Sequence, residues 1–85
     1  MKARKTLEKI RSGSRNVRFE EFQYLLEAFG FSLRHIRGSH HHYNHLGVPS
    51  RLSVQPGKDG KAKRYQLDQL LAILNEYQLR LEDEE

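Results

Sequence analysis

The segment Arg37-Gly38-Ser39-His40-His41-His42-Tyr43-Asn44-His45 lies near the middle of the chain and holds four of its five histidines. We predict that it belongs to a strand running from Ser39 to Leu46. Successive side chains of a strand point to opposite faces of the sheet. One face then carries His40, His42 and Asn44, and the other carries Ser39, His41, Tyr43 and His45. Both sets cannot be buried, so at least two histidines are expected to face solvent or a ligand.

The residues before this segment predict a first strand. Apolar and polar side chains alternate at the start of residues 31–37, as in a half-buried strand. The alternation slips at Ile36, so the face on which His35 lies is not determined. Gly38 then permits a turn, a bulge or a close approach of the backbone that a side chain would block.

A third strand is expected after a turn at Gly47-Val48-Pro49. Within residues 51–55, Leu52 and Val54 point one way and the polar residues point the other. Residues 31–55 are therefore predicted to form a small three-stranded antiparallel sheet.

Three amphipathic helices are expected around this sheet, because apolar residues recur at steps of three and four. The predicted helices span residues 1–12, 18–30 and 66–81. Asn16 or Arg18 would cap the second helix, and Gly30 would end it. An acidic tail at 82–85 follows the last helix, and fraying is expected there because the helix dipole disfavours negative charge. The element order ααβββα predicts an α+β fold, with the helices packed on one face of the sheet and the other face wet.

The composition fits one small domain with a modest core, since 36% of the 85 residues are hydrophobic. The net charge of +4 suits a polyanion such as nucleic acid, although basic surfaces also occur for solubility alone. The lack of cysteine excludes disulfides, thiolate metal sites and a cysteine nucleophile. No apolar run approaches the roughly 20 residues of a membrane span, and Met1 is followed by charges. We therefore expect a cytoplasmic protein without membrane contact.

The histidine run has three explanations. Histidines two apart on a strand can share a metal ion, but cysteine is absent and the acidic residues are concentrated in the helices and the tail. An affinity-tag remnant is opposed by the central position and by the interrupting Tyr43 and Asn44. The third explanation is proton transfer or phosphate contact, because the unperturbed pKa of histidine is roughly 6.5 and arginines flank the run. We predict neither a metal site nor a cofactor.

A basic loop is predicted at residues 56–65. Four basic residues and two glycines occur between Pro56 and Arg64. Such a loop either grips phosphates or is simply solvated. Tyr43, in the histidine-rich segment, can stack on an unpaired base. The candidate RNA-binding residues are Arg37, His42, Tyr43, Lys58, Lys61, Lys63 and Arg64.

The chain also resembles a known family. Gly30-Phe31 at a helix–strand junction, then residues 37–43 with their Gly-Ser-His core, then a short strand and an amphipathic helix, are similar to the HicA toxin family, also called YcfA-like. The resemblance runs from about Phe19 to Leu74. It implies a fold similar to the double-stranded RNA-binding domain and a metal-independent mRNA interferase, which a HicB antitoxin neutralises by covering the active site.

The resemblance also implies roles for single residues. His40, directly after Gly-Ser, corresponds to the catalytic histidine of the family, and Gly38 and Ser39 match the same motif. Two features depart from the family pattern. The stretch Gln55-Pro56-Gly57-Lys58 lacks the downstream Pro-x-His element, and the helix at residues 1–12 is an addition to the minimal domain.

We therefore expect a HicA-like endoribonuclease that cleaves mRNA and is neutralised by a HicB-type antitoxin. His40 would act as general base or acid in the attack of a ribose 2′-hydroxyl on the adjacent phosphorus, with nearby cations stabilising the charge on the phosphate. The alternative is a non-catalytic RNA-binding module of the same fold, in which the histidines are only polar contacts.

Overall fold

The computed structural model describes residues 2–81, and the predicted acidic tail at 82–85 lies outside the described residues. The chain contains α1 (Lys2–Arg11), α2 (Phe19–Ala28), β1 (Ser32–Arg37), β2 (His40–His45), β3 (Val48–Val54) and α3 (Arg64–Tyr77). This order confirms the predicted α+β fold. From α2 onward, the arrangement αβββα is that of a double-stranded RNA-binding domain.

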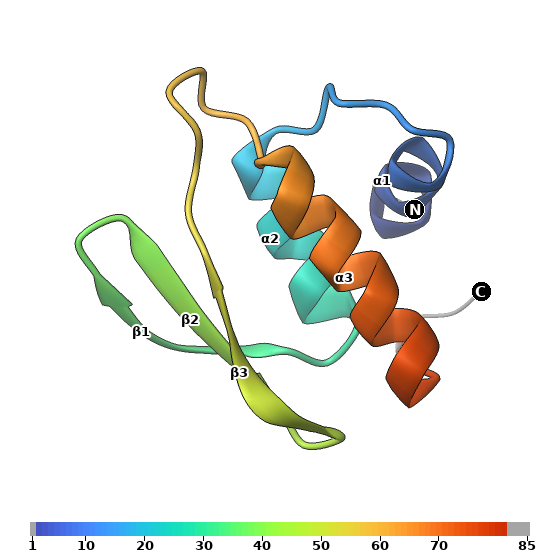
Figure 1. Cartoon of the computed structure of the whole chain (residues 1–85), viewed down its shortest axis with the longest axis vertical. Helices are drawn as coiled ribbons and strands as arrows, with labels where there is room; N and C mark the ends of the chain where they lie inside the picture. The colour runs from blue at the N-terminus through green and yellow to red at the C-terminus, as the bar shows by residue number, and fades with distance from the viewer. Residues whose placement is uncertain (1, 82–85) are drawn as a thin grey trace.

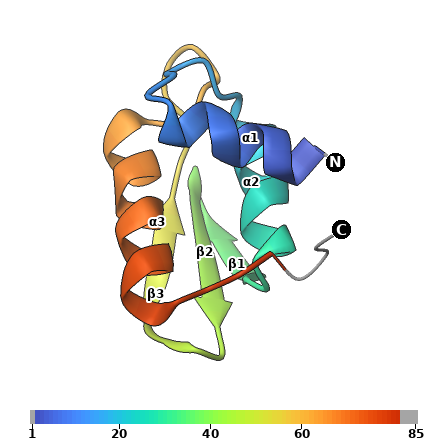
Figure 2. The same cartoon turned by 90° about the vertical axis from the view of Figure 1, so that its right-hand side faces the viewer.

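The sheet is antiparallel, with the strand order β1-β2-β3, so that the histidine-rich strand β2 is central. Figure 1 shows α2 and α3 together on one side of the sheet, which leaves the opposite side open. Figure 2 shows α1 crossing α2 on the side away from the strands. The fold therefore has one sheet face covered by helices and one face available to a ligand.

One hydrophobic core lies between the helices and the covered face of the sheet. The predicted helical stripes face this core, and the strands supply the predicted Leu52 and Val54. Fully buried side chains of this size each stabilise the fold by about 1.5–3 kcal/mol. The side chains with the least exposure include Val17, Phe22, Leu25, Leu26, Leu52, Val54 and Leu70.

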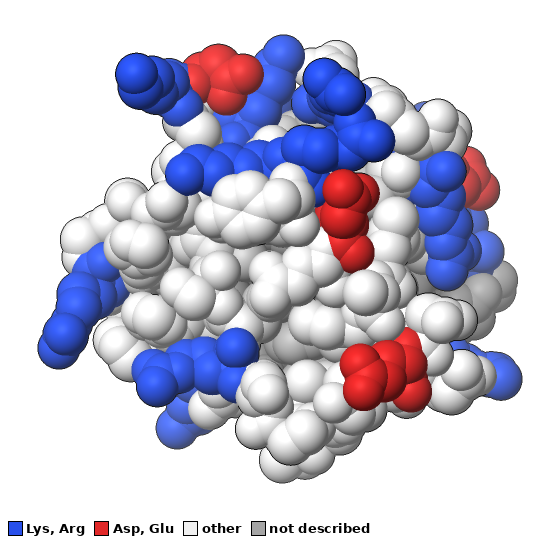
Figure 3. Space-filling view, viewed as in Figure 1, with Lys and Arg blue, Asp and Glu red and all other residues white. Residues whose placement is uncertain are grey.

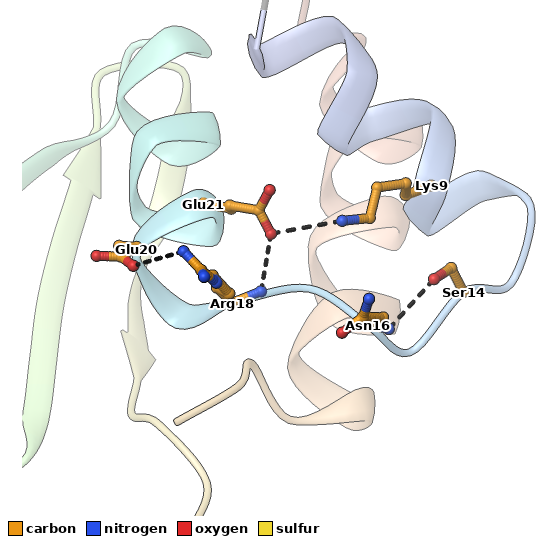
Figure 4. Close-up of polar contacts among 6 residues, drawn as sticks. All are labelled: Lys9, Ser14, Asn16, Arg18, Glu20 and Glu21. Atoms are coloured by element: carbon orange, nitrogen blue, oxygen red, sulfur yellow. Dashed lines mark hydrogen bonds and ion pairs between the residues drawn. The ribbon is translucent and has the colours of Figure 1, made fainter. Parts of the chain in front are cut away.

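The start of α2 is held by a carboxylate contact that also reaches α1 (Figure 4). Arg18, and not Asn16, is the residue that precedes the helix. Its backbone N–H donates to Oε1 of Glu21 over 2.9 Å, and Nζ of Lys9 in α1 lies 3.5 Å from the same oxygen. The hydrogen bond from Arg18 is the main cause that lowers the pKa of Glu21 below its usual value, and Lys9 adds to it.

The last helix differs from the predicted span of 66–81 at both ends. It begins at Arg64 and ends at Tyr77, because Gln78 adopts a left-handed backbone with a φ of 55°. The N–H of Leu79 then donates to the carbonyl of Leu74 over 3.1 Å, which is a common way to close a helix. The chain leaves the helical direction here and buries Leu81 in the core.

The third strand is longer than predicted. It begins at Val48 and includes Pro49, which the sequence predicts to lie in the preceding turn. Proline lacks an N–H for the ladder and is tolerated mainly on edge strands. Because β3 is an edge strand, Pro49 does not interrupt the sheet.

Replacing a buried and an exposed leucine by alanine tests this packing. Leu70 is fully buried, whereas Leu46 is fully exposed at the turn between β2 and β3. Leu70→Ala is expected to lower the free energy of unfolding by about 2–5 kcal/mol, because it leaves a cavity. Leu46→Ala is expected to change it by less than about 0.5 kcal/mol. Urea denaturation measures both, and equal losses would contradict the described core.

Candidate functional site

The turn between β1 and β2 consists of Gly38 and Ser39. Gly38 has a φ of 62°, and a Cβ at this position would meet no atom within 4 Å. The glycine is therefore required by the backbone conformation and not by a close neighbour. The hydroxyl of Ser39 donates to Oε1 of Gln55 over 3.1 Å. This bond links the start of β2 to the residue where the basic loop leaves β3.

His40 is the first residue of β2 and is exposed to solvent. It pairs in register with Arg37 of β1 across the turn. An imidazole and a guanidinium thus lie on adjacent strands beside the Gly-Ser turn. This position suits contact with a phosphodiester, which needs a proton-transfer group and a nearby cation.

Two of the other histidines face the helices and hold the backbone. The ring of His41 packs edge-on against Phe19 at a centroid distance of 5.0 Å, and its Nδ1 donates to the carbonyl of Ser39 over 3.0 Å. Nε2 of His45 donates to the carbonyl of Phe29 over 2.9 Å, while its Nδ1 accepts from the N–H of Gly47 over 2.8 Å. Both ring nitrogens of His45 are therefore occupied by backbone groups.

The remaining three histidines form a stack on the open face of the sheet. The rings of His35 and His42 lie 4.5 Å apart, and those of His42 and His40 lie 6.4 Å apart, between centroids. We call His35, His42 and His40 the histidine stack. The predicted division of β2 into two faces is confirmed by these contacts.

His42 contacts both other rings of the stack, and its pKa is lowered. Partial burial is the main cause that lowers the pKa of His42 below 6.5, and the charges of His35, Arg51, His40 and Arg37 lower it further. In addition, Nδ1 of His42 is buried and has no hydrogen-bond partner. A charged ring would place an N–H at this atom with nothing to accept it, so the neutral form is favoured.

The prediction that Tyr43 stacks on a base is wrong. Its side chain is fully buried on the helix face, and its hydroxyl accepts a hydrogen bond from Nε2 of Gln23 over 3.1 Å. Burial raises the pKa of the phenol. Tyr43 is therefore part of the core, because a residue adjacent to His42 on a strand must point to the other face.

The basic loop is held in place by backbone hydrogen bonds. The N–H of Ala62 donates to Val17 over 2.8 Å, and the N–H of Phe19 donates to Gly60 over 3.1 Å. Lys58 is exposed and Lys61 and Lys63 are partly buried. Figure 3 shows lysine and arginine side chains gathered over this loop, with others around the edge of the sheet.

Arg64 differs from the three loop lysines. It is the first residue of α3, and its Nε lies 3.6 Å from Oδ1 of Asp68, one helical turn along. Part of its charge is therefore balanced within the helix.

Two residues of the open face were not among the predicted site residues. His35 joins the stack because a register shift between Leu33 and His35 turns its side chain to the face of His42. The slip of the alternation in this strand was the only sign of that shift. The charge of Arg51, on β3, lowers the pKa of His42. Because Arg51 alternates with the buried Leu52, the sequence pattern could have placed Arg51 on the open face.

Among residues 2–81, no group of three or more His, Asp or Glu side chains could hold a metal ion. None of the helices in that range combines the length and the apolar character required to cross a bilayer.

A model of a protein family, described as the HicA toxin of bacterial toxin-antitoxin, matches residues 19–75. The match covers well over half of the 85 residues and includes the Gly-Ser-His turn. The chain belongs to the HicA toxin family. It is therefore the toxin of a toxin–antitoxin pair, and its partner is an antitoxin. The helix α1 precedes the matched region of this HicA protein. Searches of curated proteins and of solved structures return no match.

The lowered pKa of His42 predicts that the stability of this HicA protein depends on pH. The unfolded chain takes up a proton at this ring near pH 6.5, whereas the folded protein does so only at lower pH. The unfolded state therefore binds more protons in this interval, and the free energy of unfolding falls as the pH is lowered through it. Urea titrations from about pH 7.5 to about pH 5 should show a smaller loss for His42→Gln than for the wild type. Equal losses would contradict the assignment.

Proposed function

We propose that this toxin is an endoribonuclease that cleaves mRNA, with His40 moving a proton in the attack of a ribose 2′-hydroxyl on the adjacent phosphorus. The observation that supports it most is the exposure of His40 on the open sheet face, paired in register with Arg37. The family membership supports a toxic activity, and the exposed imidazole supports proton transfer as its chemistry.

The surroundings of His40 suit a polyanionic substrate. Arg37 and Arg51 lie on the open face. Lys58 lies in the basic loop, which begins just after Gln55, the residue that is hydrogen-bonded to Ser39. Cations beside a reacting phosphate stabilise the charge that builds on it in the transition state. They also attract the RNA backbone without reading its sequence.

The antitoxin of this protein is proposed to be of the HicB type and to cover the same face. The helix-covered side of the sheet is occupied by the core, and the histidine stack lies on the open side. A partner that blocks this face would exclude RNA from His40. Its contact surface is expected to be acidic, because the face it covers carries Arg37 and Arg51.

Replacement of His40 tests the enzymatic proposal. His40→Ala is expected to lower the rate of RNA cleavage by about 10²–10⁴-fold, the usual contribution of a general acid or base. Cleavage is measured in vitro on an oligoribonucleotide in the presence of EDTA, and growth arrest is measured after induction in cells. A substrate with a single 2′-deoxy substitution at the cleaved position should resist the wild-type protein.

The matched control is His45→Gln, at the other end of the same strand. His45 faces the helices and bonds only to backbone groups. This variant is expected to lose stability but to keep its cleavage rate per folded molecule. If His40→Ala cleaves as fast as the wild type while binding RNA equally, the protein fits the non-catalytic RNA-binding module instead.

Salt dependence tests which cations touch RNA. Each contact with a phosphate of single-stranded RNA contributes about 0.7 to the slope of log affinity against log salt. Lys58→Ala and Arg37→Ala are each expected to reduce the slope by about that amount. Lys5→Ala is the control, because Lys5 is exposed on α1, away from the sheet. An equal effect of all three would contradict a localised site. Fluorescence anisotropy with the 2′-deoxy substrate provides the affinities.

A further inference from the structure

The histidine stack contains more imidazoles than a single proton transfer requires. His40 and His42 lie on one strand, two residues apart, and their rings are nearly parallel at an angle of 19°. The strand rise of about 3.3 Å per residue holds their separation near the observed 6.4 Å. His35 packs against His42 from β1, with the ring centroids 4.5 Å apart.

The ring of His42 tolerates a positive charge poorly. Nδ1 of His42 is buried without a partner, so Nε2 is the ring nitrogen that can exchange a proton with a ligand, and it accepts one in the tautomer that carries its proton on Nδ1. The groups that face His42 are His35 and Arg37 from β1, His40 from β2 and Arg51 from β3, and the helices pack on the opposite face. None of these neighbours supplies a negative charge. The ring of His42 therefore favours its neutral form, in which one nitrogen is free to accept a proton.

We propose that His42 is a second catalytic residue of this toxin, the general base that activates the 2′-hydroxyl, while His40 in its protonated form is the general acid. This inference rests on the endoribonuclease function proposed above. His35 acts as a positioning residue for His42. With two rings, one accepts a proton and the other donates one, whereas a single histidine would have to do both in turn.

The step balances without water or metal. Nε2 of His42 accepts the proton of the 2′-hydroxyl, and the 2′-oxygen forms a bond to phosphorus. The bond between phosphorus and the 5′-oxygen breaks, and the leaving oxygen takes the proton of His40. The products are a 2′,3′-cyclic phosphate and a 5′-hydroxyl end. His42 is then charged and His40 neutral, and proton exchange with solvent restores both.

The geometry allows both rings to reach one phosphate. The attacking and leaving oxygens lie roughly in line on opposite sides of the phosphorus. Each ring must come within about 2.6–3.2 Å of its own oxygen. Two parallel rings whose centroids are 6.4 Å apart can flank such a group, with Arg37 and Arg51 on the neighbouring strands near the non-bridging oxygens.

The test compares an oligoribonucleotide that has a normal 5′-oxygen at the cleaved bond with one that has sulfur in its place. A thiolate leaves without a proton, since the pKa of a thiol is about 8.5, so the sulfur substrate needs no general acid. On the oxygen substrate, both His40→Gln and His42→Gln are expected to lose about 10²–10⁴-fold in rate. On the sulfur substrate, His40→Gln should recover to within about tenfold of the wild type. His42→Gln should stay slow, because the 2′-hydroxyl must still lose its proton.

Two further measurements keep the proposal independent of how the variants fold. The rate of the wild type should fall on the acidic side with a midpoint below pH 6.5, and His42→Gln should lose this limb. NMR titration of the ring protons in the RNA-free wild type should show His42 taking up its proton below pH 6.5.

The outcomes separate the two proposals. A wild type that does not cleave either RNA overturns the endoribonuclease function and this inference with it. A wild type that cleaves, together with a folded His42→Gln of unchanged rate and pH profile, overturns only the role of His42. Recovery of His42→Gln but not His40→Gln on the sulfur substrate overturns the assignment of base and acid. His45→Gln serves again as the control.

Discussion

The side chain of Tyr43 lies beneath the helices, and its hydroxyl is bonded to Gln23 of α2. This contact fixes which face of the central strand is covered. Because side chains alternate along a strand, burial of Tyr43 forces its neighbour His42, and with it His40, onto the open face. A slip of one residue would bury these imidazoles and expose the tyrosine. The location of the candidate site thus depends on the packing of one aromatic residue that takes no part in the chemistry.

The five histidines fall into two groups that differ in their hydrogen bonds. His41 and His45 donate to backbone carbonyls and pack against Phe19 and Phe31. These bonds tie β2 to the turns and to the end of α2, so the two rings act as structural groups. The three rings of the histidine stack contact mainly one another. A ring without fixed hydrogen bonds remains available for proton exchange with a ligand.

The open face brings several like charges together, which has an energetic cost for the free protein. The imidazoles lie among Arg37 and Arg51, and the three loop lysines extend the positive charge beyond the sheet. Such a surface is stabilised when a polyanion or an acidic partner covers it. Partial burial lowers the pKa of His42, and the same repulsion lowers it further. The proposed base and the proposed anion-binding surface would therefore use one set of residues.

The α+β fold and its element order follow from periodicity along the sequence, because the helical stripes and the strand alternation are local patterns. The exposure of two or more histidines and the family resemblance were readable in the same way, whereas Ser39, expected to begin the second strand, lies in the turn before it. The ends of α3 were not, since the left-handed Gln78 and the return of Leu81 to the core depend on distant packing. The face of His35, the burial of Tyr43 and the difference between His40 and His42 were also decided only in three dimensions. Alternation along a strand divides side chains into two sets, but it does not say which set the helices will cover.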